Sequence, residues 1–167
     1  MDAAVALNLV STIAIVLGLF FAGVQVRQAQ RDRTRDAQMV LVNSFNTRAF
    51  MHSMRLVIDI PDGLSRTEVE AHLRGDETDL YYWLGTMEGL GLLVFHRSVS
   101  IDLVDFAFAG PIIASWHKLE AYCRARRDEL QRESMHEWFQ WLAERLEEYE
   151  AHEGREAAQI KYRDWQP

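Results

Sequence analysis

Residues 9–24 read LVSTIAIVLGLFFAGV, a run that contains no charged side chain. A helix rises about 1.5 Å per residue, so roughly twenty apolar residues cross the ~30 Å hydrocarbon core of a bilayer. The apolar character continues upstream to Ala3, and the hydroxyls of Ser11 and Thr12 can each bond a carbonyl one turn earlier. We therefore expect residues 1–26 to form a single-pass transmembrane anchor.

The charges on either side of this segment predict its orientation. Only Asp2 precedes it, whereas four arginines follow it within a few residues: Arg27, Arg31, Arg33 and Arg35. Basic residues next to a span stay on the cytoplasmic side, so the N-terminus is expected outside and the rest of the chain in the cytoplasm. The same four arginines are expected to contact anionic lipid headgroups.

Two alternatives to a retained anchor follow from the same segment. A cleaved signal peptide needs a basic region before the apolar run and a small-x-small cleavage site after it, and this chain has neither. A helix buried in a protein core is the second alternative. It is weakened because no polar face is visible between residues 9 and 24.

Small residues recur every four positions within the predicted span, at Ala14, Gly18 and Ala22. Such spacing forms a groove that lets a second helix approach closely, which predicts a homo-oligomer or docking to a partner membrane protein. The plainer interpretation is that small residues are frequent in membrane helices in general.

Composition limits what the other residues can be. Hydrophobic residues make up 49% and charged residues 26% of the chain, which favours a packed domain over disorder. The formal charge of -7 argues against a nucleic-acid partner. Cys123 is the only cysteine, so the sequence offers no disulfide framework and no cysteine-based metal site.

The sequence after the predicted span favours helices throughout. It has few prolines, no strand-like alternation, and a near-helical apolar period that runs without a break from Arg27 to Ile58. We therefore predict an all-α fold in which one N-terminal transmembrane helix continues into a cytosolic antiparallel helical bundle. The expected parts are an anchor over 1–26, a juxtamembrane helix over 27–60, a helical bundle domain over 61–154 and a C-terminal tail over 155–167.

Capping and breaker residues divide the predicted bundle. Ser65 with Glu68, and Ser134 with Glu137, have the spacing of capping boxes, in which each side chain bonds the other's backbone N–H. Gly110-Pro111 indicates the end of one helix and the start of the next. The resulting helices are expected over 65–73, 76–96, 100–109, 111–130 and 134–154.

One acidic residue stands among glycines in the middle of an apolar helix. Gly85, Gly89 and Gly91 lack the strand and the Lys-Ser/Thr of a phosphate loop, so we interpret them as points of close helix packing. Glu88 lies between them, and if it faces inward it needs a partner such as Arg97 or His117.

The sequence gives little indication of a metal-binding or catalytic site. Glu133 and His136 have the Glu-x-x-His spacing of carboxylate-bridged metal bundles, but no second copy of the pair exists. The sequence therefore predicts no metal site, no cofactor and no catalytic set. Glu88, His96 and His117 are the candidates for a small-molecule or metal pocket, should their side chains converge.

The segment YYWLGTMEGLGLLVFHRSVSIDLVDFAFAGPIIASWHKL, residues 81–119, and WFQWLAERL, residues 138–146, resemble an uncharacterised bacterial family, domain of unknown function 4760. The resemblance implies a bacterial, membrane-anchored helical protein, and hence an anchor in the bacterial inner (cytoplasmic) membrane. It brings no activity, cofactor or catalytic residues with it.

Two hypotheses of function result. The first is a non-enzymatic, membrane-anchored cytosolic helical module that acts by self-association or by binding another protein. The alternative is a membrane-tethered enzyme or sensor with a pocket near Glu88, His96 and His117. Convergence of those three side chains on one cavity would favour the alternative.

Overall fold

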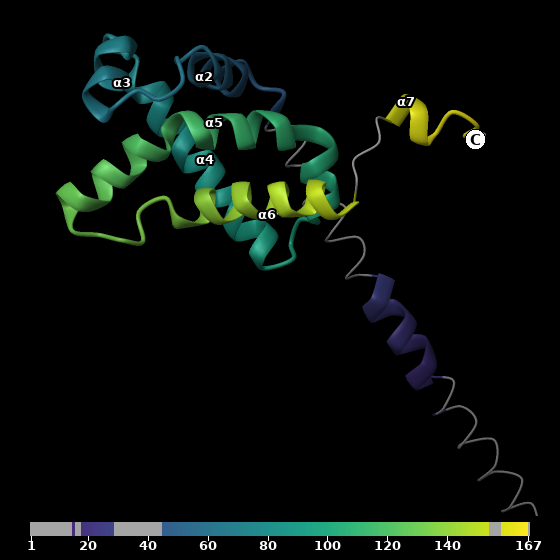
Figure 1. Cartoon of the computed structure of the whole chain (residues 1–167). Helices are drawn as coiled ribbons and strands as arrows, with labels where there is room; N and C mark the ends of the chain where they lie inside the picture. The colour runs from purple at the N-terminus through teal and green to yellow at the C-terminus, as the bar shows by residue number, and fades with distance from the viewer. Residues whose placement is uncertain (1–14, 16–17, 29–44, 154–157, 167) are drawn as a thin grey trace, which may run out of the picture. The chain divides into compact units, whose positions relative to one another are not determined.

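The computed structural model describes residues 15, 18–28, 45–153 and 158–166, and every regular element in these ranges is a helix (Figure 1). The chain divides into two units, residues 1–42 and 43–167. The second unit contains α2 (Arg48–Ile58), α3 (Arg66–Leu73), α4 (Glu77–Phe95), α5 (Ile101–Leu130), α6 (Glu137–Glu153) and α7 (Ala158–Lys161). The predicted all-α class is confirmed for the part of the chain that the structure describes.

In the first unit, residues 18–28 are helical, and the side chains there are exposed. The exposed apolar residues are Leu19, Phe20, Phe21, Val24 and Val26. None of the helices within the described ranges combines the length and apolar character needed to cross a membrane. Most of the predicted anchor lies outside the described residues, as do Ala14, Arg31, Arg33 and Arg35.

The prediction of an unbroken helix from Arg27 to Ile58 is wrong, because the helix is interrupted just before Arg48. Residues 46 and 47 form a turn, and α2 begins only at Arg48. Thr47 has an extended backbone, and its hydroxyl accepts the backbone N–H of Phe50 at 3.2 Å, which caps the new helix. The turn also lets Phe45 pack against the rings of Phe50 and Phe108, at centroid distances of 4.8 and 4.2 Å.

The predicted break at Gly110-Pro111 is absent, because α5 is one helix of 30 residues with Pro111 in its interior. Ser100 caps its start as expected, accepting the N–H of Leu103 at 3.3 Å. Proline removes one helical hydrogen bond, here to the carbonyl of Ala107. Burial of Ala109 and Ile112 on either side of Pro111 holds the helix together, since tertiary packing outweighs local propensity.

The second unit is a helical bundle around an aromatic and aliphatic core. α5 and α6 run antiparallel and in contact, and α4 packs against α6 and against α2 (Figure 1). α2 and α3 each contact α5. Trp83 of α4 packs on Phe50 of α2 at a centroid distance of 5.5 Å, and Trp116 of α5 packs on Phe139 of α6 at 5.3 Å. The core therefore ties α2 to the bundle, while the domain boundaries at 26, 60 and 154 stay predictions.

The capping box at α3 is confirmed. Glu68 accepts the backbone N–H of Ser65 at 2.8 Å and its hydroxyl at 2.6 Å. These bonds hold the pKa of Glu68 below its usual value, with the Ser65 hydroxyl as the larger cause. The α4 helix begins after Asp76 as expected, although the Asp76 side chain makes no capping bond.

Candidate functional site

Glu88 of α4 caps the start of α6. Its Oε2 accepts the backbone N–H of Phe139 at 2.9 Å, and the N–H of Trp138 also bonds the carboxylate. These two N–H groups belong to the first turn of α6, where a helix has no acceptors of its own. The partner of Glu88 is thus the backbone of another helix rather than the side chain of Arg97 or His117.

The second predicted capping box, Ser134 with Glu137, is wrong, because Glu88 of another helix caps the start of α6 instead. α6 begins at Glu137, and the residue before it, His136, has a left-handed backbone with φ of 57°. Arg127 of α5 fixes this bend by donating to the carbonyl of Met135 at 2.8 Å and to that of His136 at 3.3 Å. The cap comes from a residue 51 positions away in sequence, which a local pattern cannot reveal.

Partial burial of Glu88 has an electrostatic consequence. Desolvation raises the pKa of its carboxyl above the ordinary value, and the backbone N–H groups of Phe139 and Trp138 oppose that rise. Glu137 raises the pKa further, while Arg127 lowers it. The pKa of Glu88 is raised overall, so the ionised carboxylate is less stable here than in water.

The three candidate pocket residues have three different surroundings. Glu88 bonds the start of α6, as described above. His117 of α5 is exposed and pairs through Nε2 with Oε1 of Glu147 at 2.6 Å. His96 is exposed at the C-terminal cap of α4, with its ring 5.3 Å from that of Phe95. Across the described ranges, no group of three or more His, Cys, Asp or Glu side chains is placed to hold a metal ion.

The three glycines of α4 have two different environments. A Cβ on Gly91 would overlap the backbone carbonyl of Trp138, so this position needs glycine for α4 and α6 to touch, as expected. A Cβ on Gly85 or Gly89 would meet nothing within 4 Å among the described residues. Close packing within the bundle therefore explains Gly91 alone.

Gly85 and Gly89 lie in the middle of an exposed, uncharged face of α4. Tyr82, Leu92 and Leu93 flank them and are each about two-fifths exposed, at 41%, 39% and 42%. Between Asp79 and His96 the sequence carries one charged residue, Glu88, which is committed to α6. We call this surface the α4 face. A helix that is apolar all round is usually covered on every side.

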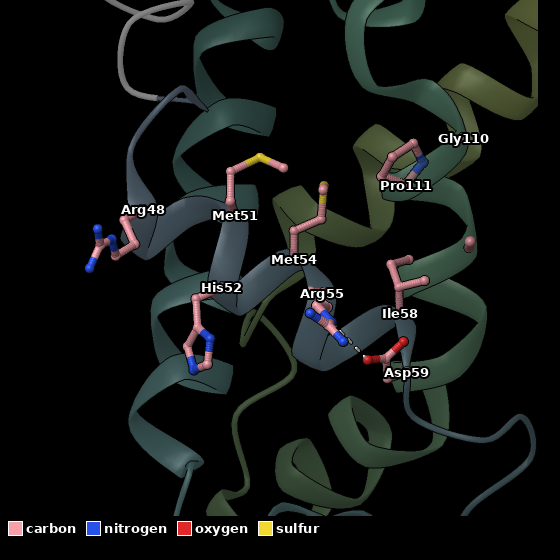
Figure 2. Close-up of a pocket in the computed structure, with 10 residues that line it drawn as sticks. Arg48, Met51, His52, Met54, Arg55, Ile58, Asp59, Gly110 and Pro111 are labelled. Atoms are coloured by element: carbon pink, nitrogen blue, oxygen red, sulfur yellow. Dashed lines mark ion pairs between the residues drawn. The ribbon is translucent and has the colours of Figure 1, made fainter.

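A second apolar surface is a groove between α2 and α5, with a volume of about 790 Å³ (Figure 2). Its apolar lining comes from Met51, Met54 and Ile58 of α2 and from Pro111 and Ala114 of α5. Figure 2 shows Met51 and Met54 extending on the same side of α2 toward Pro111. We call this the α2–α5 groove.

The sequence held a signal for the groove that was missed. Met51, Met54 and Ile58 follow the i, i+3, i+7 spacing of one helical face, offset from the buried face that contains Phe50 and Val57. The sequence does not indicate the wall formed by α5, because Gly110-Pro111 favours a helix boundary over a continuous helix surface.

Cys123 is structural. It is fully buried on α5, and burial raises the pKa of its thiol to about 12, although Arg127 lowers it in part. A thiol is nucleophilic as its thiolate, so Cys123 is inert near neutral pH.

The model of one protein family, described as Domain of unknown function (DUF4760), matches residues 9–146, most of the chain. No curated protein and no solved structure matches the chain.

Proposed function

We propose that this chain, which belongs to the DUF4760 family, is a membrane-anchored helical module that acts by binding a second copy of itself through the α4 face. The observation that carries self-association is the exposed, uncharged surface around Gly85 and Gly89. Contiguous apolar surface of this kind on a folded domain indicates an interaction site.

The shape of the α4 face favours a second copy over an unrelated partner. Gly85 and Gly89 have no side chains and are exposed, and the larger side chains of Tyr82 and Leu93 are exposed beside them. Small residues on a helix let a second helix approach closely, and two copies of this face related by a two-fold axis could pack the large side chains of each against the glycines of the other. The face offers no charge by which a partner of opposite sign could be chosen.

The anchor part of the proposal rests on the first unit. The uncharged run over residues 9–24 is followed by Arg27, and the described helix 18–28 exposes large apolar side chains. We propose a bacterial inner membrane location, with the N-terminus outside and residues 43–167 in the cytoplasm. Fractionation of cells that express the full chain, followed by carbonate and detergent extraction, tests this. Release by carbonate would contradict it.

The mass of the full chain in mild detergent, measured by light scattering after size exclusion, tests self-association. Gly89→Leu places a large side chain in the middle of the α4 face, and we expect it to convert a dimer into a monomer. Gly110→Leu is the matched control, because it makes the same change at an exposed helical glycine outside this face. It should remain dimeric.

Two outcomes would contradict the interface. A wild-type chain that is monomeric at all concentrations overturns self-association. A dimer that survives Gly89→Leu but is lost in Gly18→Leu places the contact in the N-terminal segment, at the small residues Ala14, Gly18 and Ala22, and not on the α4 face.

A further inference from the structure

The C-terminal segment, residues 158–166, carries large apolar side chains that are exposed. Trp165 is 69% exposed and Ile160 is 48% exposed. No other large hydrophobic residue that the structure describes in the second unit is more exposed than Trp165. An aromatic side chain removes roughly 150–250 Å² from water when it packs. The C-terminal segment therefore gains free energy by docking on an apolar surface.

The C-terminal segment already has local structure. It begins with the short helix α7, and the backbone N–H of Arg163 bonds the carbonyl of Ile160 at 3.4 Å. The N–H of Trp165 bonds the carbonyl of Tyr162 at 3.0 Å. A segment with such turns loses less conformational entropy on docking than an extended chain does.

The α2–α5 groove lies near the end of the bundle at which α6 ends. The hydroxyl of Tyr149, in the last turns of α6, donates to the carboxylate of Asp102 in the first turn of α5. Phe45, just before α2, packs on Phe108 of α5 at a centroid distance of 4.2 Å. The end of α6 and the start of α2 therefore both contact the N-terminal third of α5. Pro111 of the groove follows Asp102 by nine residues, about 13 Å along the helix.

The chain after α6 is long enough to reach the groove. Ile160 follows Glu153, the last residue of α6, by seven residues, which span up to about 23 Å when extended. A short tether of this kind gives an attached segment an effective concentration on the order of millimolar. A separate apolar molecule has to compete with that segment for the groove.

We propose that the C-terminal segment docks in the α2–α5 groove of its own chain, with Trp165 and Ile160 against Met51, Met54 and Pro111. In this state the chain covers its own groove, and the groove opens to another molecule only when the segment leaves. The contact is separate from the α4 face and does not depend on self-association.

The chemistry of the groove suits an aromatic anchor. Met51 and Met54 extend on the same side of α2 toward Pro111 (Figure 2). A thioether makes favourable contacts with an aromatic ring and adapts to its shape. The rim carries both signs of charge, since Arg55 and Asp59 line the groove and pair at 3.5 Å. Apolar contact rather than net charge therefore selects the occupant.

Disulfide trapping in the full chain in mild detergent tests the proposal. Cys123 is buried and its thiol is inert near neutral pH, so introduced cysteines react by themselves. Gln166→Cys combined with Met51→Cys should form a disulfide within one chain under mild oxidation, as mass spectrometry detects. Gln166→Cys with Phe106→Cys is the control, because Phe106 is exposed in the same third of α5 but does not line the groove. The control disulfide should form at least about tenfold more slowly.

Two further substitutions in the Gln166→Cys, Met51→Cys chain test the two partners. Trp165→Ser removes the anchor and should slow the disulfide about tenfold, whereas the neighbouring Arg163→Gln should not. Gly110→Leu fills the groove from the α5 side and should also slow it, because Gly110 lines the groove and has open space around it. Helix propensity favours leucine over glycine, so α5 stays intact. Gly89→Leu, outside the groove, should leave the rate unchanged.

Three results would overturn the proposal. One is a disulfide that forms equally fast with Met51→Cys and with Phe106→Cys. Another is a rate that neither Trp165→Ser nor Gly110→Leu changes. The third is a disulfide found only between two chains, which would place the segment in the groove of a second copy. Because Gly89→Leu acts on association and Trp165→Ser acts on docking, failure of either proposal is visible without the other.

Discussion

Glu88 acts as a helix cap supplied from outside the helix it caps. Its carboxylate bonds the first-turn N–H groups of Phe139 and Trp138, as a serine or aspartate at the start of α6 would otherwise do. We expect Glu88→Ala to lower the free energy of unfolding by about 1–3 kcal/mol, because it leaves two partly buried donors without acceptors. Glu88→Gln keeps an acceptor of the same shape and should cost less than about 1 kcal/mol. Urea unfolding of both variants measures the difference, and equal losses would contradict the capping role.

The raised pKa of Glu88 predicts a pH dependence of stability. Below the ordinary carboxyl value of 4.5, Glu88 is protonated in both the folded and the unfolded chain. Between that value and the raised pKa, only the folded chain holds the proton, so stability falls as the pH rises through this window. We expect the stability of the wild type relative to Glu88→Gln to be greater below pH 4.5 than at about pH 7. Unfolding free energies measured at both pH values check this, and the opposite slope would contradict it.

Gln131 ends α5 in a left-handed conformation, with φ of 49°. A side chain with a Cβ costs about 1–2 kcal/mol in this region, and glycine avoids that cost. We expect Gln131→Gly to be more stable than Gln131→Ala by about 1 kcal/mol, since both variants lose the same side-chain bond to Asp128. Thermal unfolding of the pair measures the backbone effect by itself. No difference between them would contradict the left-handed end.

Burial of Cys123 predicts slow thiol chemistry. We expect the native protein to react with a maleimide or a disulfide reagent at about pH 8 far more slowly than the unfolded protein, because the thiol stays protonated and covered. The rate of labelling with and without urea is the measurement. A fast reaction under native conditions would place Cys123 at the surface.

At the scale of single helices, some of the predicted caps form and others do not, although all of them are patterns within one turn. Ser65 with Glu68 and Ser100 cap their helices as the sequence predicted. Ser134 does not, because the bend at His136 and the carboxylate of Glu88 define the start of α6 instead. The pocket near Glu88, His96 and His117 could not be judged from sequence, since it depended on which faces of α4 and α5 meet α6.

Pro111 shows how burial overrides a local breaker. Gly110-Pro111 predicted two helices, yet the apolar side chains of one continuous helix bury on both sides of it. Pro111→Ala restores the hydrogen bond to the carbonyl of Ala107, and we expect it to raise the free energy of unfolding by about 1–3 kcal/mol. Chemical denaturation measures this. A destabilised variant would show that the ring of Pro111 contributes more by packing than the missing bond costs.

At the scale of the whole molecule, the chain divides at residue 42, and the second unit has its own core. We expect residues 43–167 to fold alone with helical circular dichroism and a cooperative transition, because the buried side chains around Trp83 and Phe139 all belong to this unit. If association uses the α4 face, this fragment should also dimerise. Loss of a cooperative transition on removal of residues 1–42 would show that the first unit is needed for folding.

Because Gly91 differs from Gly85 and Gly89 in its surroundings, mutational scanning of α4 can test the proposed dimer interface. Substitution of Gly91 forces α4 and α6 apart, so a library selected only for folded, abundant protein should reject nearly every replacement there. The same library should accept replacements at Gly85 and Gly89, where the bundle leaves room. In cells whose growth depends on this protein, all three positions should become intolerant. The difference between the two selections would then separate the residues that build the fold from those through which the protein acts.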